Sequence, residues 1–138
     1  MKLRFVFVAI AAAVAIARRS PAQAATETTN VVGEWRGTST CLVRPSPCKD
    51  EVVVYRITRL HASDSVSIDA RKVVHAREEE MGILSCRLAT SGASITCAMK
   101  NGVWRLTVQR DSLVGELRLP DDTKFRDVRT ARAHQRSQ

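Results

Sequence analysis

Short runs of alternating apolar and polar residues, broken by turn-forming residues about every ten positions, constrain this chain most strongly. No long segment has the 3.6-residue period of an amphipathic helix. The pattern predicts an all-β domain, either a sandwich or a barrel. We expect eight strands, at residues 31–40, 51–60, 64–74, 80–88, 93–99, 103–109, 113–119 and 124–130.

Three short turns in the second half of the chain indicate which strand face is buried. Asn101-Gly102 is a strong signal for a two-residue hairpin turn, because both central residues of a type I′ turn need positive φ. We expect Ser91-Gly92 and Asp111-Ser112 to form the neighbouring turns. Together they predict these opposed pairs: Cys86 with Cys97, Cys97 with Leu106, and Leu106 with Leu117.

This register gathers one apolar set on the same side of four strands. A slip of one residue would reverse the two faces of a strand, so the agreement among the three turns is informative. The predicted buried set comprises Leu84, Cys86, Leu88, Ile95, Cys97, Met99, Trp104, Leu106, Val108, Leu117 and Leu119.

An open eight-stranded meander would leave two strand edges exposed, and closure into a barrel removes them. The expected fold is therefore an eight-stranded antiparallel up-and-down barrel over residues 31–131, followed by a polar tail at 132–138. A barrel of this size is filled by side chains or holds one small ligand.

The N-terminus has the three parts of a secretory signal peptide. A short basic start precedes 13 unbroken apolar residues, 5–17, and Ala22-Gln23-Ala24 is a small-x-small cleavage site. The apolar run is short for a membrane span, which needs about 20 residues, although an uncleaved anchor is the alternative. We expect residues 1–24 to be removed, residues 25–30 to form a flexible leader, and the protein to be periplasmic or secreted with no remaining membrane span.

The four cysteines agree with export. An even number of cysteines in a small exported domain predicts two disulfides. Of the three possible pairings we favour Cys41–Cys48 and Cys86–Cys97, because each joins near neighbours in the sequence. Zinc is the alternative, but its sites usually show close Cys-x-x-Cys spacing, and the histidines here are scattered. We therefore predict no metal and no cofactor.

The charge balance argues against a nucleic-acid partner. Four of the 22 basic residues lie in the predicted signal, and all 14 acidic residues follow it, so cleavage lowers the net charge from +8 to +4. Basic residues then alternate with acidic ones, and aromatic residues that could stack on bases are scarce. The acidic residues themselves are expected to be solvated, with Asp50 and Glu51 at a strand entrance and the run 78–80 in a turn.

The segment Gly33-Glu34-Trp35-Arg36-Gly37 places a Gly-x-Trp motif on the first expected strand. This arrangement resembles the calycin group, which includes lipocalins, fatty-acid-binding proteins and avidins. The resemblance implies a lipocalin-like barrel in which Trp35 closes one end and an Arg of the last strand, Arg126 or Arg129, packs across it. The chain is shorter than a lipocalin and shows no helix after the barrel.

Several further pieces resemble an uncharacterised family of small secreted bacterial proteins. They lie at residues 33–41, 48–55, 102–104 and 119–126. The likeness covers most of residues 31–130, implies a bacterial exported protein, and supplies no activity.

The sequence contains no nucleophile elbow, Walker loop or zinc-protease motif, so we predict a protein that is not an enzyme. The most favoured hypothesis is a non-catalytic, monomeric binding protein for a small hydrophobic or amphipathic ligand. The candidate ligand-binding residues are Trp35, Tyr55, Trp104, Arg126 and Arg129.

The alternative is an envelope interaction or inhibitor protein. Small exported barrels with a disulfide also resemble bacterial inhibitors of proteases and lysozymes. Such a protein would act through the loop from Leu42 to Pro47, because two prolines and a disulfide would stiffen that loop and lower the cost of ordering it.

Overall fold

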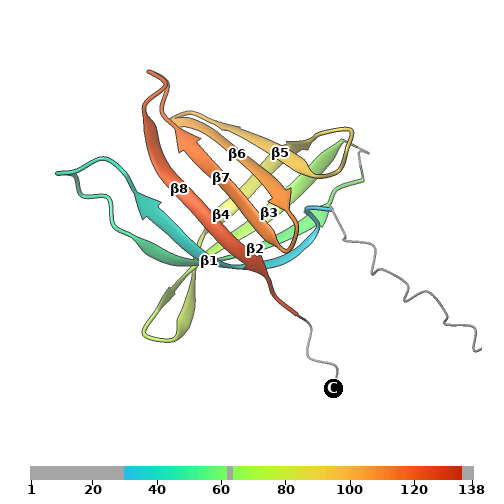
Figure 1. Ribbon diagram of the computed structural model, residues 1–138, viewed down its shortest axis with the longest axis horizontal. Helices are drawn as coiled ribbons and strands as arrows, with labels where there is room; N and C mark the ends of the chain where they lie inside the picture. The colour runs from blue at the N-terminus through green and yellow to red at the C-terminus, as the bar shows by residue number, and fades with distance from the viewer. Residues whose placement is uncertain (1–29, 62–63, 135–138) are drawn as a thin grey trace, which may run out of the picture.

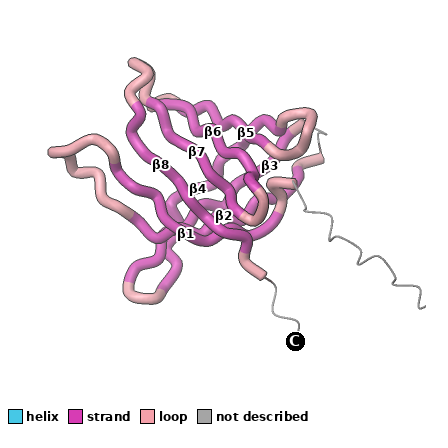
Figure 2. The backbone as a smooth tube through the Cα atoms, in the orientation of Figure 1, coloured by secondary structure: helices cyan, strands magenta, loops and turns pink. Residues whose placement is uncertain are grey.

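The computed structural model describes residues 30–61 and 64–134, and within them every regular element is a β-strand (Figures 1 and 2). The predicted signal peptide, residues 25–29 of the predicted leader, and residues 135–138 of the predicted tail lie outside the described residues. No helix in the described ranges is long and apolar enough to cross a membrane. The strands are β1 (Gly33–Cys41), β2 (Glu51–Arg59), β3 (Ser65–Val74), β4 (Arg77–Leu88), β5 (Ser94–Met99), β6 (Gly102–Gln109), β7 (Ser112–Arg118) and β8 (Lys124–Arg132).

The strands form a closed antiparallel barrel in sequence order, which confirms the predicted fold. Strands that are consecutive in the chain are also adjacent in the sheet, and β8 pairs with β1 to close the barrel. In that closing ladder Trp35 lies opposite Arg132 and Cys41 lies opposite Arg126. Closure removes the two edges that a meander would otherwise expose.

Period-2 alternation sends one face of every strand into the barrel and the other face to solvent. Most of the apolar set predicted from the turns is buried, although Met99 is 36% exposed and Leu84, Trp104 and Leu119 are partly buried. The first half of the chain completes the core with inward residues of β1, β2 and β3. Those residues are Trp35, Val53, Tyr55, Ile57, Val66, Ile68 and Ala70.

Two of the three predicted turns lie one residue earlier than expected, which shifts the pairing register of their strands by two residues. β5 and β6 pair Met99 with Gly102, so the loop is Lys100–Asn101 and not Asn101-Gly102. The φ of Gly102 is 150°, and a Cβ there would lie 2.3 Å from the carbonyl oxygen of Arg118. This glycine therefore permits the close approach of β7 and does not occupy a central position of the turn.

The turn between β6 and β7 shows the same error. Its loop is Arg110–Asp111, with Arg110 at a φ of 57°, and Gln109 lies opposite Ser112. A shift of two residues leaves each side chain on its predicted face. The buried face was therefore predicted correctly although Cys97 faces Trp104 rather than Leu106.

The β4–β5 hairpin has the predicted register, with Arg87 opposite Thr96 and Leu88 opposite Ile95. This register brings Cys86 and Cys97 to disulfide distance, with Cα atoms 4.2 Å apart. The amide of Ala89 donates to the carbonyl of Ser94, so the loop spans four residues. Alternation then makes the cysteines a non-hydrogen-bonded pair, which has the shorter Cα spacing, and not the hydrogen-bonded pair implied by a two-residue turn.

The acidic run Glu78–Glu80 was predicted to be a solvated turn, but it belongs to β4. The turn is His75–Ala76, and both residues have positive φ, at 49° and 62°. The pair gives little turn signal in the sequence, because non-glycine residues with positive φ are uncommon, and although His adopts this conformation more often than most, Ala does not. An extra residue in β4, Met81, produces a bulge opposite Ala70 and Arg71.

Candidate functional site: a cavity at one end of the barrel

The two ends of the barrel differ. At one end, Val31 and Trp35 are fully buried, and the indole Nε1 of Trp35 donates to the carbonyl of Val31 at 2.7 Å. The guanidinium of Arg132 lies 4.1 Å from the centre of the Trp35 ring and donates to the carbonyls of Asn30 and Val32. These contacts plug the end of the barrel, which we call the closed end.

At the opposite end, which we call the open end, the barrel encloses a cavity of about 210 Å³. The β1–β2 loop, the β3–β4 hairpin and the β7–β8 loop extend on this side, to the left in Figure 1. The walls combine apolar side chains with four polar ones. The lining residues are Ser39, Glu51, Tyr55, Ile68, Ala70, Met81, Gly82, Leu84, Met99, Trp104, Leu106 and Arg126.

Arg126 organises the polar rim of the cavity. Its side chain is only 13% exposed, because Arg126 lies on the same inner face of β8 as the buried Val128 and Thr130. Nη1 donates to the hydroxyl and carbonyl oxygens of Ser39 at 3.1 and 3.3 Å, and Nη2 donates to the carbonyl of Lys49 at 3.0 Å. The carboxylate of Glu51 lies 3.4 Å from Nη1. A buried positive charge is thereby compensated by one carboxylate and three oxygen acceptors.

Tyr55 supplies a neutral hydroxyl beside this cluster. The side chain is 5% exposed, and burial raises the pKa of its phenol to about 12, while the positive charge of Arg126 opposes that shift. Tyr55 therefore stays protonated at neutral pH, where its hydroxyl can donate or accept a hydrogen bond. Its ring forms part of the cavity wall.

The remaining walls are apolar. Trp104 on β6 and Leu84 on β4 are partly buried against the core, and Met81 and Met99 at the mouth are 41% and 36% exposed. Methionine adapts to ligands of different shape because its side chain is unbranched and polarizable. The cavity therefore offers an apolar surface with Arg126, Glu51, Ser39 and Tyr55 on one side.

The structure brings together three of the five predicted ligand-binding residues. Tyr55, Trp104 and Arg126 line the cavity, whereas Trp35 lies at the closed end. Arg129 points outward on β8, where its side chain is 76% exposed and pairs with Asp127.

The Arg expected over Trp35 was assigned to the wrong position. Arg126 and Arg129 were the candidates, but Arg132 makes this contact, from the last residue of β8 and within the segment predicted as a polar tail. The reason is geometric: Trp35 lies directly opposite Arg132, whereas Arg126 lies opposite Cys41 at the other end of the ladder.

Two polar residues of the cavity, Ser39 and Glu51, were not among the predicted ligand-binding residues. Ser39 follows Trp35 at period 2 on β1, so strand alternation placed its hydroxyl on the inner face. Glu51 was expected at a solvated strand entrance, but its carboxylate turns to Arg126 at the rim. No sequence signal links Glu51 to Arg126, because their proximity depends on β8 closing against β1.

The loop from Leu42 to Pro47 is held by contacts within itself. Cys41 and Cys48 lie at disulfide distance, as predicted, and the peptide between Arg44 and Pro45 is cis. Asp50 accepts from the amide of Cys41 and from the guanidinium of Arg44, both at 2.8 Å. Leu42 remains 45% exposed, so the loop presents an apolar side chain on a preorganised backbone.

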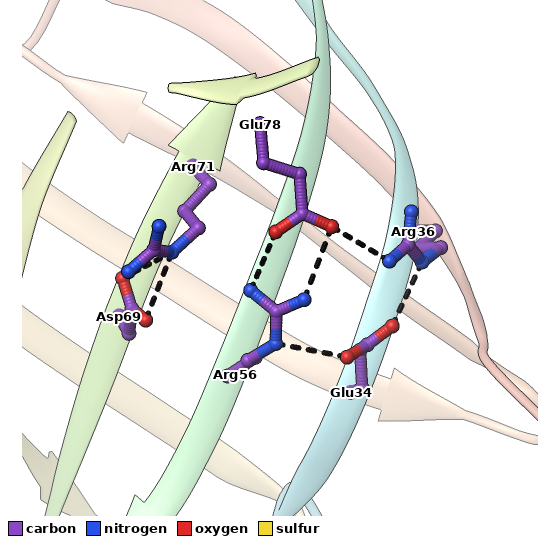
Figure 3. A network of polar contacts seen from close by, with 6 residues as sticks. All are labelled: Glu34, Arg36, Arg56, Asp69, Arg71 and Glu78. Carbon is purple, nitrogen blue, oxygen red and sulfur yellow. Dashed lines mark hydrogen bonds and ion pairs between the residues drawn. The ribbon is translucent and has the colours of Figure 1, made fainter. Parts of the chain in front are cut away.

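An ionic network covers part of the outer barrel surface (Figure 3). Glu78 accepts from Arg36 at 2.8 Å and from Arg56 at 2.7 Å, and Glu34 bridges the same two arginines. Hydrogen bonds from Arg56 and then Arg36 lower the pKa of Glu78 to about 2. Val54, which lies opposite Arg36 in the β1–β2 ladder, is fully buried on this outer face. The network therefore fastens the β3–β4 hairpin to the outside of β1 and β2.

Within residues 30–61 and 64–134, no three His, Cys, Asp or Glu side chains are grouped so that they could hold a metal ion. Comparisons with protein-family models, with curated proteins and with solved structures found no match for this chain.

Proposed function

We propose that this chain is an exported, non-catalytic binding protein that holds a small hydrophobic or amphipathic molecule in the open end of its barrel. The observation that carries the proposal is a cavity of about 210 Å³ whose apolar walls meet a buried polar cluster at one rim. A few fixed polar groups on a largely apolar surface are typical of small-molecule sites, because they orient a ligand that burial alone would not.

The volume limits the size of the ligand. An apolar cavity of about 150 Å³ binds benzene, and drug-sized ligands occupy roughly 300–1,000 Å³. We therefore favour a molecule with one ring or a short alkyl chain, carrying a polar group that reaches Tyr55 or Arg126. A long acyl chain would extend out of the mouth.

The test uses three probes: benzyl alcohol, hexanoate and palmitate. We expect the two small probes to bind and to raise Tm. Palmitate should bind no more tightly than hexanoate, because its longer chain would extend out of the cavity. Binding would be measured by calorimetry on the mature protein. If neither small probe binds at millimolar concentration, the cavity is not a site for ligands of this size.

A matched pair of variants separates the cavity from the rest of the surface. Ala70→Phe places a ring in the cavity and should abolish binding of the small probes. Ala131→Phe makes the same change at an exposed position of β8 and should leave binding unchanged. Equal affinity in both variants would contradict the proposed site.

The proposal of export rests on the signal-like N-terminus and on the two cysteine pairs at disulfide distance. Disulfides persist in oxidising compartments outside the cytoplasm. Mass spectrometry of the protein recovered from the periplasm or medium should show a chain that begins at Ala25. Recovery of the full-length chain from the cytoplasm would contradict export.

The preorganised loop from Leu42 to Pro47 supports a second candidate, an envelope interaction or inhibitor protein. Its backbone is already ordered, so binding through Leu42 would cost little conformational entropy. Leu42→Asp should then abolish partner binding, while Leu60→Asp, at a similarly exposed site on the far side of the barrel, should not. A partner that binds both variants equally would exclude this loop.

A further inference from the structure

The barrel wall has a gap between β4 and β5. The β4–β5 ladder holds two residue pairs, Arg87–Thr96 and Leu88–Ile95, flanked by the Ala89–Ser94 hydrogen bond and the Cys86–Cys97 disulfide, whereas β3 and β4 pair over almost their whole lengths. β5 ends at Met99, and the part of β4 before Cys86 continues past the last pair without a partner from β5. We call this unpaired side of residues 77–85 the β4 edge.

The direction of the main-chain groups along the β4 edge follows from the β3–β4 ladder. The amide of Leu88 donates to the carbonyl of Asp64, so that pair is hydrogen-bonded. Pairs alternate along an antiparallel ladder, and the N–H and C=O groups of Ser85 and Ile83 therefore point away from β3. No ladder pair within the described ranges joins either residue to β5.

The side chains beside the β4 edge have a distinct character. Ile83 is 67% exposed and Met81 is 41% exposed, which makes Ile83 the most exposed large apolar side chain of the described part of the chain. Glu79 and Glu80 are also exposed and lie on the same strand. The edge thus combines free backbone donors and acceptors with an apolar side chain and negative charge.

We propose that the β4 edge is a docking site for an extended peptide segment with basic and apolar side chains, which pairs with β4 as an added strand. Only another extended backbone offers donors and acceptors at the spacing of a strand edge. Ile83 lies opposite Asp69 and Glu80 opposite Arg71, so both share the outer face of β4. An apolar side chain of the segment would cover Ile83, and a basic one two positions along would face Glu80. This edge adjoins the small-molecule cavity proposed above, because Met81, Gly82 and Leu84 of β4 also line that cavity, but it is recognised through its main-chain groups and not through the cavity.

Charge selects against the other occupant of a free edge, a second copy of this chain. Every copy carries the same run of three glutamates, and exposed charges on an edge strand are a known means of preventing self-pairing. A basic peptide would instead be attracted by the same carboxylates.

The test uses the mature protein and an acetylated, amidated heptapeptide whose odd positions alternate valine and lysine and whose even positions are serine, so that valine and lysine share one face of the added strand. We expect the amides of Ile83 and Ser85 to exchange with solvent at least about tenfold more slowly when the peptide is bound, because both gain main-chain hydrogen bonds. The same peptide N-methylated at every amide keeps its charge and side chains but should not bind. Equal binding of the methylated peptide, or protection at other strands alone, overturns the proposal.

Two pairs of variants test charge and backbone separately. Glu80→Lys should weaken binding about fivefold, whereas Asp111→Lys, the same change at the closed end, should leave it unchanged. Ile83→Pro removes the outward amide and should abolish binding, while Ile83→Ala keeps that amide and should only weaken it. If Ile83→Pro does not fold, the methylated peptide tests the same hydrogen bond.

One further outcome would count against the proposal. Slower exchange of the β4 amides at high protein concentration without peptide, together with a doubled mass in solution, would show that the edge pairs two copies. A tenfold weaker affinity for a heptapeptide in which glutamate replaces lysine would support the basic partner.

Discussion

At the scale of single residues, Trp35 and Trp104 show how position along a strand separates a structural role from a candidate binding role. Both are inward aromatic residues, and both were candidates for the ligand site. Trp35 satisfies its indole N–H inside the closed end, and Trp104 lines the cavity. Both are the third residue of their strands, and they lie at opposite ends of the barrel because β1 and β6 run in opposite directions.

Tyr55 offers a direct probe of the cavity, because it is the single tyrosine of the chain. We predict that its phenol ionises with a pKa of about 12 rather than about 10, since burial disfavours the phenolate. The folded pKa lies above the unfolded one, so stability is unaffected below pH 10 and declines as the pH rises towards 12. Ultraviolet difference titration at 295 nm measures this value.

Arg126→Gln provides the control for this titration. Removing the positive charge should raise the pKa of Tyr55 further, because Arg126 at present favours the phenolate. A tyrosine in the wild type that ionises near 10 before the protein unfolds would show that the phenol is solvated.

Arg132 should matter more for stability than its place near the chain end suggests. Arg132→Gln loses the contact with the Trp35 ring and weakens the bonds to the carbonyls of Asn30 and Val32, which should lower the free energy of unfolding by roughly 1–3 kcal/mol. Arg129→Gln, on the same strand but exposed, should change it by less than about 0.5 kcal/mol. Urea denaturation of both variants checks the difference, and equal effects would contradict the plug at the closed end.

At the scale of elements, all eight strands were predicted from alternation, with errors of a few residues at their ends. The clearest error, at the start of β4, has a physical cause. Three consecutive glutamates usually mark solvated segments, but here Glu78 is held by Arg36 and Arg56 from two other strands. Such a contact depends on the tertiary fold and cannot be predicted from a local sequence pattern.

The two hairpin shifts have a related cause. Asn101-Gly102 is a good turn signal by local rules, yet Gly102 is needed where β7 approaches closely, and the turn moves back by one residue, which shifts the β5–β6 register by two. The predicted buried and exposed faces of these strands are unaffected by this error, because the register shifts by an even number of residues. Contacts that depend on the exact partner, such as Cys97 with Trp104, were not predictable from the turn alone.

The Glu78 network predicts a stability contribution that depends on pH and salt. The folded pKa of Glu78, about 2, lies below the unfolded value, so its contribution is present above about pH 4.5 and is lost as the pH falls towards 2. We expect Glu78→Gln to lower stability by about 0.5–1 kcal/mol at pH 7 and low salt, with a smaller effect at pH 2 or in 1 M salt. Glu79→Gln, whose nearest cation is 3.7 Å away, is the matched control. Urea denaturation at both pH values measures the effect of Glu78→Gln on the free energy of unfolding. An effect of the same size at pH 7 and at pH 2 would contradict a contribution from the network.

At the scale of the whole molecule, the barrel is closed by side chains at one end and open to a cavity at the other. Sequence alternation predicted the closed sheet and its apolar lining. Alternation could not predict whether the barrel contains a cavity, because the internal volume depends on strand stagger and on how far the side chains at each level fill the interior. Trp35, Val31 and Arg132 fill one end, whereas Ala70 and Gly82 are small residues on paired strands beside the cavity.

The most direct measurement of the central claim follows the two indole N–H signals of the protein by NMR during titration with benzyl alcohol. The chain has two tryptophans, one at each end of the barrel, so each signal reports on one end. We predict that the Nε1–H signal of Trp104 shifts and saturates, while that of Trp35 stays in place. A saturating shift of Trp35 alone, or no shift of Trp104 at saturation, would contradict a binding site at the open end.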